Sequence, residues 1–412
     1  MIINGLSDTV YTRCVREDPS HRGLLYAGTE TGVMISFDDG ASWQSLQLNL
    51  PNTPVHDIQI QKRENDLVIA THGRSFWILD DITTLYQLNE HVSKSKAWLF
   101  RPKDTYRFPG ADNAVKDFDN PHDGQNAYNG VVLRYYLKTK PEKEIKLKFY
   151  TEAGDSIITY SSIKDNKGKM VPVKKEFYEN PKVTSSGLLR SKAGINEFVW
   201  NMRYPDAKAD TSATFYASPL GPKLIPGTYK VKLLLNDSLV NEQLFRIIAD
   251  PRNSATVADL KEQFDLNMSI CKKLNEIAKG NAQIKQVTAQ INHFMASITD
   301  SVSVRSFREK VKGITDSLDA IKNELFNEKI QADEDNLRFP LELEEKIATL
   351  NYEVQNSDTK PTASMYTVYS SLSSQIDIQL LRLKNILDMK VPELNKFAIS
   401  LQKPILDTQV KE

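Results

Sequence analysis

Two pairs of neighbouring aspartates stand where carboxylates could do chemistry. Asp38 and Asp39 lie within the segment SFDDGASW at residues 36–43, just ahead of a glycine. Asp80 and Asp81 follow a second strand-like run further along the chain. Two adjacent carboxylates could hold a metal ion or work as an acid and base, whereas a single one could accept backbone hydrogen bonds in a turn. The surrounding residue types decide between these roles.

The residues around Asp38 favour the turn. A carboxylate at the tip of a β-hairpin can accept hydrogen bonds from backbone N–H groups that the turn leaves without partners. Gly40 would supply the unusual backbone angles, and the hydroxyls of Ser36 and Ser42 would add bonds across the turn. The ring of Trp43 would return to the core between hairpins. We therefore predict a structural role for Asp38, with neither catalysis nor metal binding.

Other reactive groups form no recognisable catalytic or metal site in the sequence. Glycosidases commonly use two carboxylates that flank the scissile bond, and no such pair is evident. Asp117, Asp119 and Asp123 lie close together and could bind calcium, but their spacing is not that of an EF-hand, which favours a hydrophilic loop. No His/Cys pair has zinc spacing, and no glycine-rich phosphate loop is present. We expect no metal and no cofactor.

Composition bounds the class of protein. The 412 residues include 53 basic and 53 acidic side chains, so net charge gives no reason to expect a nucleic-acid partner. This length predicts several domains. Cys14 and Cys271 lie in regions that differ in pattern, so we expect no structural disulfide. No apolar run reaches the roughly 18 residues that span a bilayer, and the first residues do not resemble a signal peptide.

Residues 1–95 alternate short apolar runs with Gly, Asp and Asn, as strands and hairpins do. Within them a repeat of 43 residues is visible. A period of roughly 40 to 45 residues with about four strands is typical of a β-propeller blade, and propellers close with roughly 4 to 8 blades. Either the chain is the C-terminal portion of a longer propeller, or two units pack in another way. The matched pairs are Leu25 with Val68, Tyr26 with Ile69, Ala27 with Ala70, Val33 with Phe76, Ile35 with Ile78 and Asp38 with Asp81.

Two further regions differ in period. Residues 96–252 keep strand patterns without the repeat, which predicts an immunoglobulin-like β-sandwich. In residues 253–412 apolar positions recur at steps of three and four, which predicts four amphipathic helices, the first capped by Thr256 with Asp259. Pro340 and Pro361 interrupt this pattern at hairpin-like intervals and favour a bundle within the chain, with a homodimer through the helical region as the alternative. The predicted fold is multidomain: an all-β part of two blades and a sandwich, then an all-α bundle.

The segment from Ser36 to Trp43 fits the pattern Ser/Thr-x-Asp-x-Gly-x-Thr/Ser-Trp and resembles the Asp-box, or BNR repeat. That motif occurs in sialidases, sortilin-type receptors and xyloglucan-cleaving glycosidases, all of them β-propellers. The segments ATHGRSFWILDD, GQNAYNGVVLRYYL, GINEFVWNMRYPDA and PGTYKVKL also resemble parts of large bacterial glycosyl hydrolase-like or sortilin-like BNR-repeat proteins. The resemblance touches most of residues 10–250. After Asp80 and Asp81 the glycine and tryptophan are missing, so that stretch is a degenerate box or the exit from the last blade.

The resemblance implies a glycosyl hydrolase-like parent that acts on or binds carbohydrate and is secreted or periplasmic. A non-enzymatic, sortilin-like scaffold that binds peptide or glycan is the alternative. In the families that it resembles, the box lies on the face opposite the ligand site, so the loops with Glu30, His72 and Arg74 would lie on the ligand face. These three side chains would bind a sugar or an acidic group, or else bond neighbouring loops. We expect this chain alone to be inactive.

Overall fold

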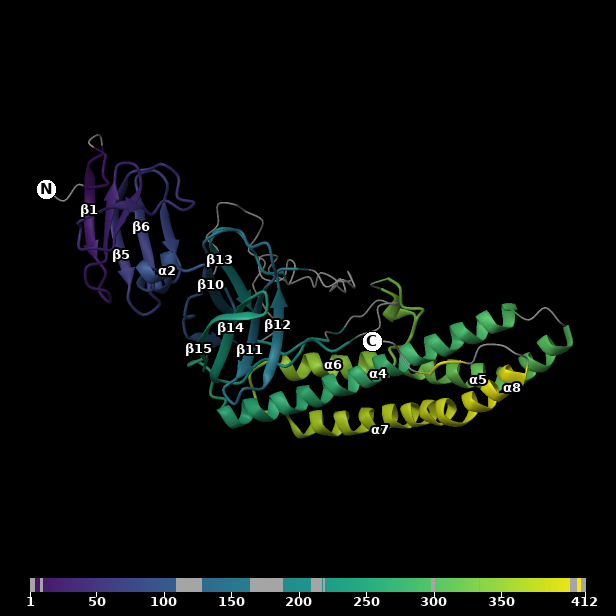
Figure 1. Cartoon of the computed structure of the whole chain (residues 1–412). Helices are drawn as coiled ribbons and strands as arrows, with labels where there is room; N and C mark the ends of the chain where they lie inside the picture. Colours follow the sequence, from purple (N-terminus) through teal and green to yellow (C-terminus); the bar gives the residue numbers. More distant parts are fainter. Residues whose placement is uncertain are drawn as a thin grey trace.

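The structure is a computed structural model that describes residues 4–7, 10–108, 128–163, 188–208, 217, 219–297, 301–332, 334–400 and 406–408. Its N-terminal part is rich in β-strands and its C-terminal part is helical (Figure 1). This confirms the predicted order of an all-β part before an all-α part in broad outline. Two short helices depart from it, because α1 (Thr83–Tyr86) and α2 (Glu90–Lys94) lie between β-sheets.

The first two sheets are antiparallel meanders, in which strands that follow one another in sequence are neighbours in the sheet. The first contains β1 (Thr12–Glu17), β2 (Leu25–Thr29), β3 (Val33–Ser36) and β4 (Gln44–Ser45), and the second β5 (Val55–Gln61), β6 (Asp66–Thr71) and β7 (Phe76–Leu79). The sequence pattern predicts six of these strands, while β4, with two residues, is too short to show such a pattern. Apolar side chains from both sheets form a single core.

Strand pairing corrects one detail of the 43-residue repeat. In the first sheet Tyr26 lies opposite Ile35, whereas in the second Val68 lies opposite Ile78. The third strands therefore correspond at 43 residues, but the structural equivalent of Tyr26 is Val68 and not Ile69. The reason is the hairpin loop between β6 and β7, which is one residue longer than the loop between β2 and β3.

The next two sheets pack around one core that includes the fully buried Trp200. Strand β15 (Ser238–Ala249) pairs with β14 (Gly227–Leu235) through a hairpin turned by Asn236 and Asp237, both with positive φ. One sheet has the order β13 (Gly194–Trp200), β10 (Val131–Leu137) and β8 (Ala97–Leu99), and the other β12 (Ser156–Ser161), β11 (Ile145–Thr151), β14 (Gly227–Leu235), β15 (Ser238–Ala249) and β9 (Thr105–Arg107). The β9–β15 pair is parallel, unlike the antiparallel arrangement expected.

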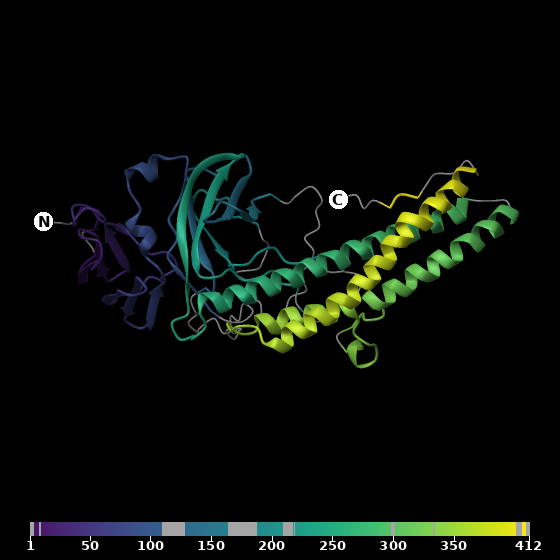
Figure 2. The same ribbon diagram turned by 90° about the horizontal axis from the view of Figure 1, so that it is seen from below.

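The helices form an elongated assembly (Figure 2). Their apolar side chains meet in a core within this one chain. The helices are α4 (Val257–Ser297), α5 (Ser301–Leu325), η1 (Asp335–Leu337), α6 (Leu343–Gln355), α7 (Ala363–Asn385), the π-helical η2 (Ile386–Lys390) and α8 (Val391–Ser400). The predicted cap is confirmed, since the Asp259 N–H donates to the Thr256 hydroxyl at 3.1 Å and Asp259 accepts from that hydroxyl at 2.6 Å. Among the described residues no helix is long and apolar enough to cross a membrane. Association of two copies through this region stays a prediction.

Buried polar groups join the helices to the β-rich part. Arg107 at the end of β9 forms an ion pair with Asp358, in the turn between α6 and α7, and both side chains are almost wholly buried. Arg107 also donates to the Gln263 side chain of α4 at 3.0 Å. Arg203, equally buried, donates to the Gln355 side chain of α6. Because buried polar groups need partners, these bonds fix where the helices meet the sheets.

Candidate functional site

The carboxylate of Asp38 is bonded within its own turn. Its Oδ1 accepts from the Ser36 hydroxyl at 2.7 Å and from the Ser42 backbone N–H at 2.8 Å, and its Oδ2 accepts from the Ser42 hydroxyl at 2.5 Å. Bonds from the Ser42 hydroxyl, then from the Ser42 N–H and the Ser36 hydroxyl, lower the pKa of Asp38. The group is therefore a stable anion that holds a bend, and it is poorly suited to donate a proton in catalysis.

The same turn uses two left-handed residues. Gly40 has a φ of 85°, as its predicted role requires, and Asp39 adds a φ of 58°. Aspartate is among the few non-glycine residues that adopt this conformation readily. The Gly40 N–H donates to the Ser36 hydroxyl at 2.9 Å, and Trp43 is buried behind the turn. All five residues of the predicted Asp-box thus lie in one closed bend.

The second aspartate pair serves a different purpose. Asp81 accepts from the Thr83 hydroxyl at 2.6 Å, and its other oxygen lies 2.9 Å from a guanidinium nitrogen of Arg134 on β10. Partial desolvation of its carboxylate, followed by the nearby carboxylate of Asp66, raises the pKa of Asp80, although the residue as a whole is exposed. This bend marks the exit from the second sheet and ties it to the next one.

Strand directions decide which loops share an edge of the two meanders. Each chain reversal alternates between the two ends of the strands. Residues 29–32, 46–54 and 71–75 therefore gather at one end, which we name the distal edge. The turn of Asp38 and the bend of Asp81 lie at the opposite end, where the second sheet meets β10. The distal edge carries Glu30, His72 and Arg74.

Glu30 has a partner that sequence reasoning missed. Its carboxylate accepts a hydrogen bond from Arg13 Nε at 2.7 Å, across the start of β1. The bond to Glu30 raises the pKa of Arg13, although both side chains are partly exposed to solvent. Only the pairing of β1 with β2 brings these two residues together, so their separation in sequence gave no signal. The carboxylate of Glu30 is therefore already engaged in an ion pair with Arg13.

His72 and Arg74 lie on the longer hairpin loop of the second sheet. The His72 ring lies 5.1 Å from the ring of His56. The backbone N–H of His72 donates to the backbone carbonyl of Pro54 at 2.9 Å. Arg74 is exposed, and no bond from its guanidinium to a described residue is seen. In the part of the chain that the structure describes, no hydrogen bond or ion pair joins Glu30 to His72 or Arg74. The three share an edge without forming one cluster.

A hollow of about 350 Å³ opens beside Glu30 at the distal edge. Its lining combines apolar side chains with neutral hydroxyl and amide groups, and none of its residues is charged. Such groups can exchange hydrogen bonds with the hydroxyls of a sugar. The sequence pattern did not predict this hollow, because its lining comes from two segments, residues 29–34 and 45–52, that another turn separates in the sequence. The lining residues are Thr29, Thr31, Gly32, Val33, Met34, Ser45, Gln47, Leu50 and Asn52.

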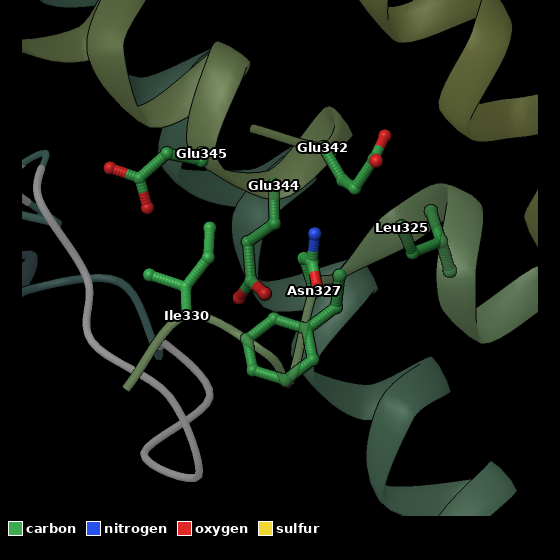
Figure 3. Close-up of a pocket in the computed structure, with 7 residues that line it drawn as sticks. Leu325, Asn327, Ile330, Glu342, Glu344 and Glu345 are labelled. Atoms are coloured by element: carbon green, nitrogen blue, oxygen red, sulfur yellow. The ribbon is translucent and has the colours of Figure 1, made fainter. Parts of the chain in front are cut away.

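A second, much smaller pocket lies in the helical region, with room for about one water at about 10 Å³. Figure 3 shows Glu344 directed between Ile330 and Asn327, with Glu342 and Glu345 to either side. Glu345 accepts from the Ala217 N–H at 2.6 Å, and burial raises the pKa of Glu342. This space is too small for a substrate.

Neither metal chemistry nor known relatives add to these observations. Within the described ranges, no group of three or more His, Cys, Asp or Glu side chains could hold a metal ion. The calcium alternative at Asp117, Asp119 and Asp123 lies outside the described residues. Comparison of the chain with protein-family models, curated proteins and solved structures gave no match.

Proposed function

We propose that this chain is the C-terminal part of a glycosyl hydrolase-like BNR/Asp-box propeller protein, and that its distal edge binds carbohydrate. The observation that carries the proposal is the closed bend of Asp38 at one end of two successive meanders, with the loops that contain Glu30, His72 and Arg74 at the other end. The meanders would be the last two blades, and residues 96–252 an immunoglobulin-like sandwich. The resemblance also suggests a secreted or periplasmic parent.

The distal edge is better suited to binding than to hydrolysis. Glycosidases need two carboxyl groups roughly 5 to 10 Å apart. Glu30 is the only carboxylate within residues 29–32, 46–54 and 71–75, and it is already paired with Arg13. Any hydrolysis by the parent would use carboxylates of other blades. The neutral hollow beside Glu30 favours an uncharged sugar.

A peptide-binding, sortilin-like role is the second candidate, and Arg74 is the observation in its favour. An exposed guanidinium with its donors free can bind a carboxylate through two parallel hydrogen bonds. An acidic side chain or the C-terminus of a peptide would provide that group. His72 lies beside it and could add a further donor.

Retention on immobilised polysaccharides distinguishes these functions. We expect the chain to bind a neutral polysaccharide without releasing reducing ends, and Thr31→Val with Asn52→Ala to weaken retention about tenfold, since each removes hydrogen-bonding groups of the hollow. Thr12→Val is the matched control, because Thr12 is exposed outside the hollow. Binding of an acidic peptide that Arg74→Ala abolishes, without polysaccharide retention, would favour the second candidate. Retention unchanged in the double variant would contradict the carbohydrate site.

A further inference from the structure

A β-bulge lies at the same position in the first two sheets. The register of β1 with β2 shifts by one residue at Arg13, and that of β5 with β6 shifts by one residue at His56. The 43-residue repeat makes these two positions equivalent. A bulge takes the side chain of its extra residue out of the regular alternation of the strand and aims it elsewhere.

In both sheets the bulged residue meets the residue that directly follows the second strand. In the first sheet Arg13 donates to the carboxylate of Glu30 at 2.7 Å. In the second sheet the ring of His56 lies 5.1 Å from the ring of His72, and the two planes are tilted by 41°. One arrangement of the chain thus holds an ion pair in the first sheet and two imidazoles in the second.

The main chain at His72 is fixed by bonds to the segment that precedes β5. Its N–H donates to the Pro54 carbonyl at 2.9 Å, and its carbonyl accepts from the Thr53 hydroxyl at 3.2 Å. The first of these bonds has its counterpart in the first sheet, where the N–H of Glu30 donates to the Tyr11 carbonyl at 3.2 Å. A fixed backbone is what a ligand-binding side chain requires for a defined geometry.

The two imidazoles are available for a ligand. Both residues are exposed, and within the described ranges no hydrogen bond or ion pair of either ring is seen. Two imidazoles cannot reproduce the ion pair of the first sheet, because they carry like charges when both are protonated. Neutral imidazole is, however, the commonest metal ligand in proteins.

The separation of the rings suits a shared metal ion. A zinc ion bound about 2.0 to 2.1 Å from one nitrogen of each ring lies about 3.2 Å from each ring centre, so at a tetrahedral angle the centres are about 5.2 Å apart. The observed separation is 5.1 Å. Two ligands are fewer than the three or more of a self-sufficient metal site, none of which the described residues contain, so water would complete the coordination.

We propose that His56 and His72 together bind one divalent ion of the zinc, nickel and copper class. Imidazole nitrogen suits these metals, whereas calcium and magnesium prefer oxygen ligands. The ion ties the start of β5 to the loop between β6 and β7 and keeps its remaining positions for water. Neither histidine lines the uncharged hollow, so this site goes beyond the proposed carbohydrate binding.

Calorimetric titration of residues 1–412 with Zn²⁺, without any polysaccharide, tests the site. We expect one ion per chain. His56→Phe with His72→Phe keeps two rings in contact but removes the nitrogens, and should lower the affinity at least about tenfold, the effect that losing even an outer partner of a ligand has. His91→Phe is the matched control and should leave the affinity unchanged, because the exposed His91 packs against Trp98 and not against a second histidine.

Cu²⁺ in place of Zn²⁺ adds a readout of the ligands themselves, since electron paramagnetic resonance detects the nitrogens bound to the metal. Two nitrogens are expected in the parent and fewer in the double variant. A parent that binds no Zn²⁺ would show that the rings only pack together. Binding that the double variant leaves unchanged would place the ion elsewhere in the chain, and either result overturns the proposal. Because no sugar is present, neither result bears on the carbohydrate function.

Discussion

The bends of Asp38 and Asp81 both contain an Asp-Asp dipeptide, but they have different structural roles. Both aspartates accept from a nearby hydroxyl, of Ser42 in one case and of Thr83 in the other. Asp38 is bonded only inside its turn, whereas Asp81 also pairs with Arg134 on another sheet. A dipeptide therefore specifies a bend, while the fold decides whether that bend becomes a connection between sheets.

Asp358 carries the comparison further. Its side chain is 5% exposed and pairs with Arg107 across the boundary between sheets and helices, whereas the Asp81 side chain is 13% exposed and Asp38 faces solvent. Water screens an exposed charge and leaves a buried one dependent on its partner. The cost of removing each interaction should follow this order.

Asp358→Ala should have the largest effect. The substitution leaves the Arg107 guanidinium buried without its counter-charge, which typically costs about 3 to 5 kcal/mol. Chemical denaturation followed by circular dichroism measures the loss. Lys261→Ala removes an exposed ion pair of α4 as the control and should cost about 0.5 kcal/mol or less. Equal losses in the two variants would contradict the ranking.

Arg134→Met should lower the free energy of unfolding by an intermediate amount, about 1 to 3 kcal/mol. The substitution leaves the partly buried carboxylate of Asp81 without its counter-charge and also removes the bond to Glu197. Hydrogen exchange should rise in α1 and α2, which lie between the two connected sheets. Arg246→Met breaks the more exposed pair with Asp104 and is the matched control. If exchange in α1 and α2 is the same in both variants, Asp81 does not anchor the second sheet.

Asp38→Asn should have a smaller effect that depends on pH. The pKa of Asp38 is lowered in the folded chain, so its contribution is present above the unfolded pKa of about 3.9 and is lost as the pH falls through the folded pKa. Thermal midpoints of the variant and the parent should therefore differ at pH 7 and converge on acidification below about pH 4. A difference that is constant with pH would show that the charge is not involved.

Asp80→Asn should have the smallest effect, with the opposite sign. Partial desolvation and then Asp66 raise the pKa of Asp80, so the stability linked to its protonated form is present below the unfolded pKa and is lost as the pH rises through the folded pKa. The neutral amide should raise the thermal midpoint slightly at pH 7 and leave it unchanged at pH 3. A lower midpoint at pH 7 would mean that the Asp80 charge is stabilising.

Local patterns predicted the elements better than the contacts between them. Alternation marked β2 and β6, and steps of three and four marked α4, since each pattern reflects burial of one side of one element. The strands β4, β8 and β9 are two or three residues long and depend on pairing with distant partners. The Asp38 bend could be predicted because all its bonds lie within seven residues.

The distal edge shows the limit of this approach. Topology could place Glu30 and Arg74 at one end, because hairpins alternate direction. The Arg13 partner and the hollow depend on strand register and on how the loop at residues 46–54 folds, and neither leaves a periodic signal. Strand register also changes the residue that is equivalent to Tyr26, which is Ile69 in the sequence repeat and Val68 in the structure. The reason is that one added loop residue shifts the pairing by one and exchanges the two sides of a strand.

The buried junction of Arg107 and Asp358 has a mechanical consequence. Helix α4 has 41 residues and is about 60 Å long, and one of its ends lies at this junction. A helix held at its base works as a lever arm, so a slight rotation at the junction becomes a wide sweep at the remote tip. The Arg107–Asp358 ion pair, together with the bond from Arg203 to Gln355, would resist that rotation and so limit the displacement of the far end.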